Sequence, residues 1–116
     1  MLFSAIVVDD EPYAREELIY ILSHFPTCQI IGEAGSAKDC IFLYSKVKSD
    51  VVFLDIEIPD MSGLEIANML STFNEPPLIV FATAYDDYAI EAFELGAIDY
   101  ILKPFEEKRI AKTIMR

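Results

Sequence analysis

Basic residues are scarce in this sequence. Nine lysines and arginines stand against twenty aspartates and glutamates, which gives a net charge of −11 at pH 7. A surface this negative repels nucleic acid and anionic lipid, so DNA binding by this segment itself is disfavoured. The same charge favours basic partner surfaces or bound cations.

Long apolar runs are also missing. No run approaches the roughly 20 residues that a membrane-spanning helix needs. No charged-then-apolar leader opens the chain at Met1. We therefore expect a cytoplasmic protein that makes no membrane contact.

Cysteine and histidine are nearly absent. The two cysteines, Cys28 and Cys40, have no metal-ligand spacing and lie in apolar surroundings. They are interpreted as buried thiols of a reducing compartment. The single histidine, His24, falls at the end of an expected helix, and a surface position is favoured there over a phosphorelay or metal-binding role.

The length of 116 residues suits one domain that buries a single core. Just over half of the residues are hydrophobic and a quarter are charged, which is typical of a soluble globular protein. One domain is expected over residues 1–116. Because the sequence stops at Met115-Arg116 within a helical pattern, we expect an output domain beyond residue 116.

Short apolar runs alternate with amphipathic helical patterns along the whole chain. Unbroken apolar runs are typical of parallel strands that are covered on both faces. Five strand–helix units predict an α/β fold with a doubly wound, five-stranded parallel sheet and five helices. The expected strands are residues 5–8, 29–31, 51–54, 78–82 and 100–102.

Residues with strong positional preferences mark the ends of the expected helices. Pro12 suits a first helical turn, and Ser36 suits an N-cap. Ser62 and Glu65 have the spacing of a capping box. Gly96 is placed to end a helix.

Polar residues follow the expected strands directly. They are Asp9, Asp10, Asp55, Thr83 and Lys103. Because the carboxyl ends of parallel strands share one edge, we expect these side chains to meet there. Three adjacent carboxylates need a cation, and a set of oxygen ligands suits Mg²⁺ or Mn²⁺.

The combination at this edge is more informative than any member. Alone, Asp9 and Asp10 could simply begin a helix. Together with an ammonium and a hydroxyl group, an aspartate carboxylate can act as the nucleophile of phosphoryl transfer. Lys103 precedes Pro104, which favours an unusual backbone, a cis bond included, that would fix the ammonium group.

Several motifs carry a family resemblance over essentially the whole length. The stretches are IVVDDEP at 6–12, VFLDI at 52–56, PDMSG at 59–63, FATA at 81–84, GAIDY at 96–100 and KP at 103–104. With these motifs in this order, the chain resembles the response-regulator receiver domain of two-component signalling. The resemblance implies a flavodoxin-like fold with strand order 2-1-3-4-5.

The resemblance implies a role for each residue at the sheet edge. Asp55 would be the phosphoacceptor, and the donor would be a phosphohistidine on a sensor histidine kinase. Asp10 and Asp55 would bind Mg²⁺ directly, Asp9 through water, and Glu57 through its backbone carbonyl.

The resemblance also implies a switch. Thr83 and Lys103 would bind the phosphoryl oxygens, and Thr83 would move toward them. Tyr100, expected to be a half-exposed ring with two rotamers, would then turn inward. Glu57 and Tyr85 would tune the lifetime of the acyl phosphate.

The expected output is a change of surface. In the family the fourth helix, fifth strand and fifth helix serve dimerisation, which here means residues 89–93, Tyr100 and the helix after Phe105. The segment 83–93 resembles receivers that precede a LytTR-type DNA-binding domain. DNA would then be bound only by a domain beyond residue 116, to regulate transcription.

Two other functions stay open. An aspartyl-nucleophile phosphohydrolase of the haloacid dehalogenase type would need a second Asp two residues after Asp55, where this chain has Glu57, and a cap domain. A receiver-like module that is never phosphorylated is disfavoured by the complete set of site residues. We expect a signalling switch that catalyses only its own phosphorylation and slow dephosphorylation.

Three further charged residues are interpreted without a role at the site. Asp60 and Asp99 suit turns and caps. Arg109 is interpreted as a solvated charge on a helix face.

Overall fold

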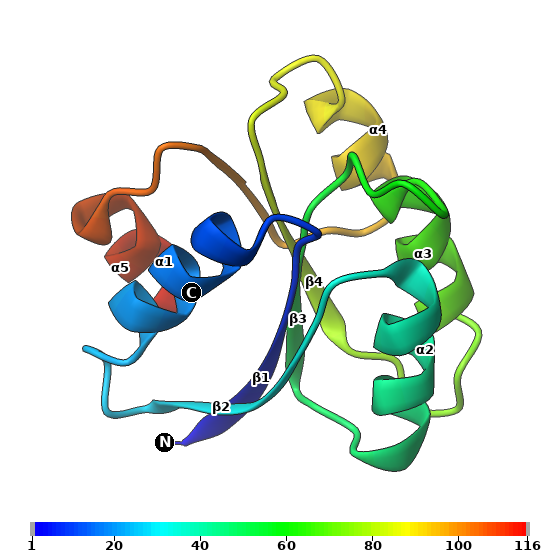
Figure 1. Cartoon of the computed structure of the whole chain (residues 1–116), viewed down its shortest axis with the longest axis horizontal. Helices are drawn as coiled ribbons and strands as arrows, with labels where there is room; N and C mark the ends of the chain where they lie inside the picture. Colours follow the sequence, from blue (N-terminus) through cyan, green and yellow to red (C-terminus); the bar gives the residue numbers. More distant parts are fainter. Residues whose placement is uncertain (1, 116) are drawn as a thin grey trace.

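The computed structural model describes residues 2–115, in which strands and helices alternate strictly (Figure 1). Met1 and Arg116 lie outside the described residues, so the helical pattern expected at the last residue is not tested there. The elements are β1 Phe3–Val8, α1 Pro12–Leu22, β2 Cys28–Ala34, α2 Ala37–Lys46, β3 Val51–Leu54, α3 Gly63–Leu70, β4 Leu78–Thr83, α4 Ala89–Glu94, β5 Asp99–Leu102 and α5 Glu107–Ile114.

The five strands form one parallel sheet in the order β2-β1-β3-β4-β5, which confirms the expected fold. Figure 1 shows α1 and α5 on one face and α2, α3 and α4 on the other. Each face has its own buried cluster of apolar side chains. The central strand β3 is therefore buried along its entire length, which is why its sequence is continuously apolar.

The edge strand β2 is longer than its sequence predicts. Pairing with β1 carries it over seven residues, through Gly32 to Ala34. A Cβ at Gly32 would lie 2.7 Å from a methyl group of Leu43, so the glycine permits close packing of α2. Exposed Glu33 weakens the apolar pattern, and strand pairing overrides this local signal.

Most helix ends follow the expected chemistry. Pro12 stands in the first turn of α1, and Ser36 accepts a hydrogen bond from the Asp39 N–H at 3.1 Å. Gly96, with φ +90°, ends α4. The capping-box expectation is wrong in one respect: the Ser62 hydroxyl accepts from the N–H of Leu64, not from that of Glu65.

Both cysteine thiols are buried and unpaired, as expected. Burial raises the pKa of Cys28 to about 11 and that of Cys40 to about 12, so both stay protonated at neutral pH. Among residues 2–115, no helix is long and apolar enough to cross a bilayer.

Candidate functional site

The carboxyl ends of β1 and β3 bring three acids together, as the sequence predicts. One carboxylate oxygen each of Asp9, Asp10 and Asp55 lies within 4.8 Å of the other two. Asp9 and Asp55 are only 4% exposed, and Asp10 is more accessible. Side chains with this spacing can share one metal ion.

Lys103 reaches into this cluster from the end of β5. Its Nζ lies 2.9 Å from Asp9 Oδ2, 3.1 Å from Asp55 Oδ2 and 3.3 Å from Glu11 Oε1. The peptide bond between Lys103 and Pro104 is cis. The sequence predicted Lys103 at this place, whereas the part played by Glu11 was missed.

The pKa values of Asp9 and Lys103 are both raised in this cluster. Burial raises the pKa of Asp9, and hydrogen bonds from Lys103 and the Glu11 amide only partly oppose this. Burial alone would lower the pKa of Lys103, but its contacts with Asp9 and Asp55 outweigh burial and raise it. One ammonium group cannot neutralise this many carboxylates, so the oxygen-only donor set fits an added hard cation such as Mg²⁺.

Asp55 is held at both carboxylate oxygens and through its backbone. Oδ1 accepts the N–H of Ile56 at 2.7 Å, and Oδ2 accepts from Lys103. A Cβ at Gly63 would lie 2.1 Å from the Asp55 carbonyl oxygen, so only glycine fits the start of α3 here. The site thus depends on close contact between α3 and the end of β3.

Thr83 lies at the end of β4, fully buried. Its Oγ1 accepts the N–H of Tyr85 at 3.4 Å. The expectation of a half-exposed Tyr100 is wrong: the ring is 9% exposed, packs near Phe81, and its hydroxyl donates to the Tyr85 carbonyl. Burial raises the pKa of Tyr100 to about 12, so this donor keeps its proton.

A second tyrosine joins the two loops beside Asp55. The Tyr88 hydroxyl donates to Glu57 Oε2 at 3.1 Å, linking the β4–α4 loop to the β3–α3 loop. The ring of Tyr85 meets that of Tyr88 edge to face, with 6.3 Å between centroids. Glu57 and Tyr85 are both exposed, and their tuning roles stay predictions.

Two of the remaining charged residues differ from expectation. Asp99 is a buried partner of Arg109, with Nη2 and Oδ1 2.7 Å apart, and also accepts from the Thr113 hydroxyl. Arg109 is therefore not simply solvated, because α5 packs its guanidinium against β5. Asp60 does cap a helix, but a distant one: it accepts the N–H groups of Ala37 and Lys38.

Arg15 is a second residue that sequence reasoning missed. Its guanidinium donates to the backbone carbonyl of Asp9 and pairs with Glu33 on β2. No local pattern marks an arginine inside a helix as a partner of a strand-end carbonyl, so only the fold reveals it.

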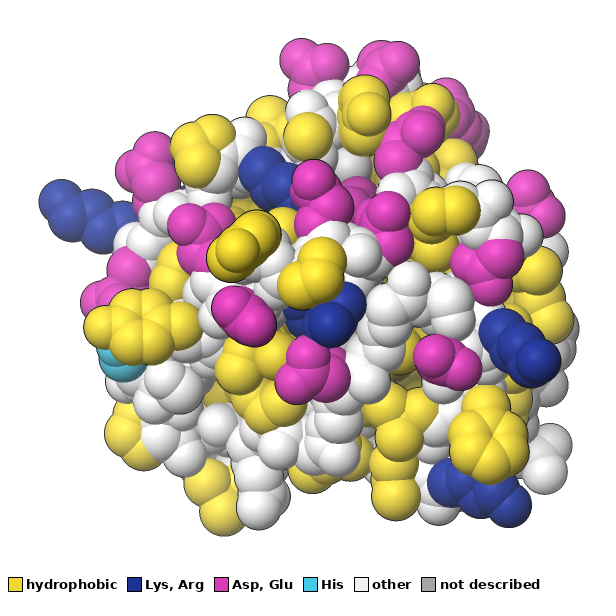
Figure 2. Space-filling model, viewed as in Figure 1, with side chains coloured by type: hydrophobic (Ala, Val, Ile, Leu, Met, Phe, Trp, Pro, Cys, Tyr) yellow, Lys and Arg dark blue, Asp and Glu magenta, His cyan; other side chains and the backbone are white. Residues whose placement is uncertain are grey.

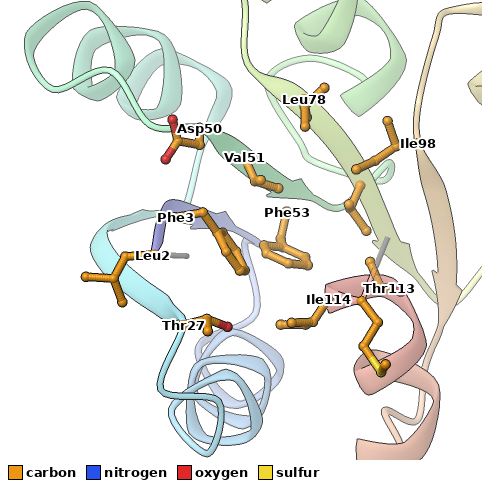
Figure 3. Close-up of a pocket in the computed structure, with 12 residues that line it drawn as sticks. Leu2, Phe3, Thr27, Asp50, Val51, Phe53, Leu78, Ile98, Thr113 and Ile114 are labelled. Atoms are coloured by element: carbon orange, nitrogen blue, oxygen red, sulfur yellow. The ribbon is translucent and has the colours of Figure 1, made fainter.

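The opposite edge of the sheet has a different character. A hollow of about 640 Å³ lies at the end of α5. Figure 3 shows that it is lined mainly by apolar side chains such as Phe3, Phe53 and Ile114. Asp50 also lines it, but none of Asp9, Asp10 and Asp55 does. Figure 2 shows acidic side chains scattered over the face that is viewed there, with few basic ones between them.

Comparisons with known proteins agree with this geometry. The family model for the response regulator receiver domain matches residues 5–115. The chain is 51% identical to the sensory transduction protein LytT of Bacillus anthracis over 115 residues, covering 99% of this chain and 47% of that protein. It is 49% identical to the transcriptional regulatory protein BtsR of Salmonella typhi, covering 99% and 48%.

A solved structure is similar as well. The response regulatory domain of mrkE from Klebsiella pneumoniae superimposes with a TM-score of 0.90 at 39% identity, covering 97% of this chain and 92% of that one. The chain spans about half the length of the curated relatives it matches.

Proposed function

The chain belongs to the response regulator receiver domain family, and we propose that Asp55 accepts a phosphoryl group from the phosphohistidine of a sensor histidine kinase. The observation that carries the proposal is the placement of the Asp55 carboxylate, buried between Lys103 and two further acids. A carboxylate in this setting can attack phosphorus once added positive charge offsets the acids.

The transfer is a nucleophilic displacement at phosphorus. A carboxylate oxygen of Asp55 forms a bond to phosphorus, the P–N bond of the phosphohistidine breaks, and its electron pair stays on the imidazole nitrogen. Lys103 binds a phosphoryl oxygen, with Pro104 positioning its backbone. Thr83 supplies a second donor after its hydroxyl leaves the Tyr85 amide.

Asp9, Asp10 and Asp55, with the Glu57 backbone carbonyl, would hold Mg²⁺, and Mn²⁺ could replace it. When bound, the ion offsets the charge shared by the carboxylates and the phosphoryl oxygens. The acids would then serve as its ligands, and Lys103 would keep its contact with Asp55.

The product is a signal rather than a released metabolite. Thr83 and Tyr100 would report the phosphoryl group, and Glu57 and Tyr85 would tune its lifetime. The surface formed by α4, β5 and α5 would then form a homodimer. Transcription would be regulated by a LytTR-type DNA-binding domain beyond residue 116. The lengths of LytT and BtsR support this, because the chain covers 47% and 48% of them. The pathway would operate in the cytoplasm.

Acetyl phosphate with Mg²⁺ tests the proposal. We expect intact-mass spectrometry to show the gain of one phosphoryl group in the wild type. The gain should be abolished by Asp55→Asn and by EDTA, and retained by Asp39→Asn, which alters an exposed acid on α2. A wild type that gains no phosphoryl group from acetyl phosphate or a phosphorylated kinase would refute the assignment.

The same reaction separates a switch from a phosphohydrolase. A receiver releases about one phosphate per phosphorylated chain and does so slowly. Rapid release of many phosphates per chain from a small phosphoester would instead favour the hydrolase.

A further inference from the structure

Arg15 lies on α1, beside the turn that carries Asp9 and Asp10. Its Nη1 donates to the Asp9 carbonyl oxygen at 2.7 Å. Its Nε lies 2.7 Å from Glu33 Oε1, and the Arg15 side chain is 20% exposed. Because Glu33 belongs to β2, one guanidinium connects a helix, a turn and the edge strand.

Gly35 leaves room for this guanidinium. A Cβ added at Gly35 would lie 3.2 Å from Arg15 Nη1 and 3.9 Å from the Asp9 carbonyl oxygen. A side chain at this position would therefore press on the contact between Arg15 and Asp9.

The other polar atoms of Asp9 also have partners. Its N–H donates to Ala34 at 3.1 Å. Its Oδ1 accepts the Glu11 N–H at 2.9 Å, and its Oδ2 lies 2.9 Å from Lys103 Nζ. Arg15 completes the set by holding the carbonyl.

The position of the Asp9 carbonyl also fixes the position of the Asp10 backbone N–H. A peptide group is planar, so the Asp9 carbonyl and the Asp10 N–H move as one rigid unit. We infer that Arg15 is a positioning residue that holds the peptide between Asp9 and Asp10, and thereby keeps their two carboxylates arranged for a divalent cation. The inference rests on the cation site proposed above.

Electrostatics alone predicts the opposite effect of removing Arg15. The guanidinium is a positive charge beside a cation site, so its loss would tighten cation binding. Loss of positioning would weaken binding, because groups that orient metal ligands typically contribute about 10- to 100-fold to metal affinity. The sign of the change therefore distinguishes the two explanations.

The test is calorimetric titration of the whole chain with Mg²⁺. We expect Arg15→Met to weaken binding about tenfold. Arg15→Lys should weaken it less, because an ammonium group can still donate to the Asp9 carbonyl. Gly35→Ala, which changes no charge, should weaken it about threefold by displacing the guanidinium.

A matched control separates positioning from general loss of stability. Tyr44→Phe removes the hydrogen bond from the Tyr44 hydroxyl to the Glu75 carbonyl, which lies between α3 and β4 and away from the acids. Its Mg²⁺ affinity should equal that of the wild type even though its thermal unfolding temperature falls.

The outcomes are separable. Equal or tighter Mg²⁺ binding by Arg15→Met overturns the inference and leaves the cation site standing. Absence of Mg²⁺ binding in the wild type overturns both. If Arg15→Met does not fold, wild-type affinity in both Arg15→Lys and Gly35→Ala overturns the inference, and weakened binding in both supports it.

Discussion

At the scale of single residues, Asp99 shows how the fold assigns a role that the sequence does not reveal. It is 2% exposed and bound by the guanidinium of Arg109 and the hydroxyl of Thr113. Desolvation would raise the pKa of Asp99, but these bonds outweigh it and lower the pKa to about 2, against an ordinary value of 3.8.

This lowered pKa predicts a pH-dependent contribution to stability. The folded state favours ionised Asp99, so the contribution is complete above about pH 4 and is lost as the pH falls toward about 2. It amounts to about 2 kcal/mol. Urea unfolding should show that the difference in free energy of unfolding between the wild type and Asp99→Asn disappears as the pH falls from about 4 to about 2. The exposed control Glu94→Gln should show no such difference, and a pH-independent difference for Asp99→Asn would contradict the prediction.

At the scale of elements, the site depends on how closely α3 approaches the end of β3. Gly63 lets the helix start against the Asp55 backbone, where a Cβ would lie 2.1 Å from the carbonyl oxygen and 2.8 Å from Ile56 Cα. Neither backbone atom can yield as a flexible side chain would, so a methyl group must displace α3 or the backbone of Asp55.

Gly63→Ala should therefore lower the free energy of unfolding by about 3 kcal/mol and slow phosphorylation by acetyl phosphate. Gly96→Ala is the matched control, because Gly96 has φ +90° and open space around its would-be Cβ. The free energy of unfolding of Gly96→Ala should fall by only about 1 kcal/mol. Acetyl phosphate should phosphorylate this variant at the wild-type rate. Chemical denaturation and mass spectrometry provide the two measurements. Equal effects of the two variants would show that the contact with Asp55 is unimportant.

The elements also show how far the sequence can predict. Buried parallel strands are recognised in the sequence as apolar runs. The polar residues at their carboxyl ends, Asp9, Asp10, Asp55, Thr83 and Lys103, could therefore be placed at one edge of the sheet before the structure was known. The bonding partners of Arg15, Tyr88 and Arg109 could not be predicted, because each of these bonds joins segments whose side-chain directions depend on tertiary packing. Tyr100 was misjudged for the same reason.

At the scale of the whole molecule, the acid cluster opposes folding electrostatically. Folding brings Asp9, Asp10 and Asp55 together, with Lys103 paired to two of them, in a chain whose net charge is −11. A cation that binds only the folded state must stabilise the protein by mass action.

Mg²⁺ at about ten times its dissociation constant should add about 1.4 kcal/mol and raise the unfolding temperature by roughly 5 °C. The measurement is a thermal melt followed by circular dichroism, with KCl at matched ionic strength to account for screening. In Asp10→Asn, most of the rise in unfolding temperature caused by Mg²⁺ should be lost. An equal rise in KCl alone would show that Mg²⁺ acts only as a general salt.

The parallel arrangement of the sheet divides the loops into two groups. The residues proposed to bind the phosphoryl group and the cation lie at the carboxyl end of a strand or in the loop that follows it. The turns that precede β3 and β4 lie at the far edge, beside the apolar hollow. For protein engineering, the two edges are separate regions. Under the proposed function, changes in the loops that follow strands should alter phosphorylation, and changes in the turns that precede them should alter mainly the stability of the domain.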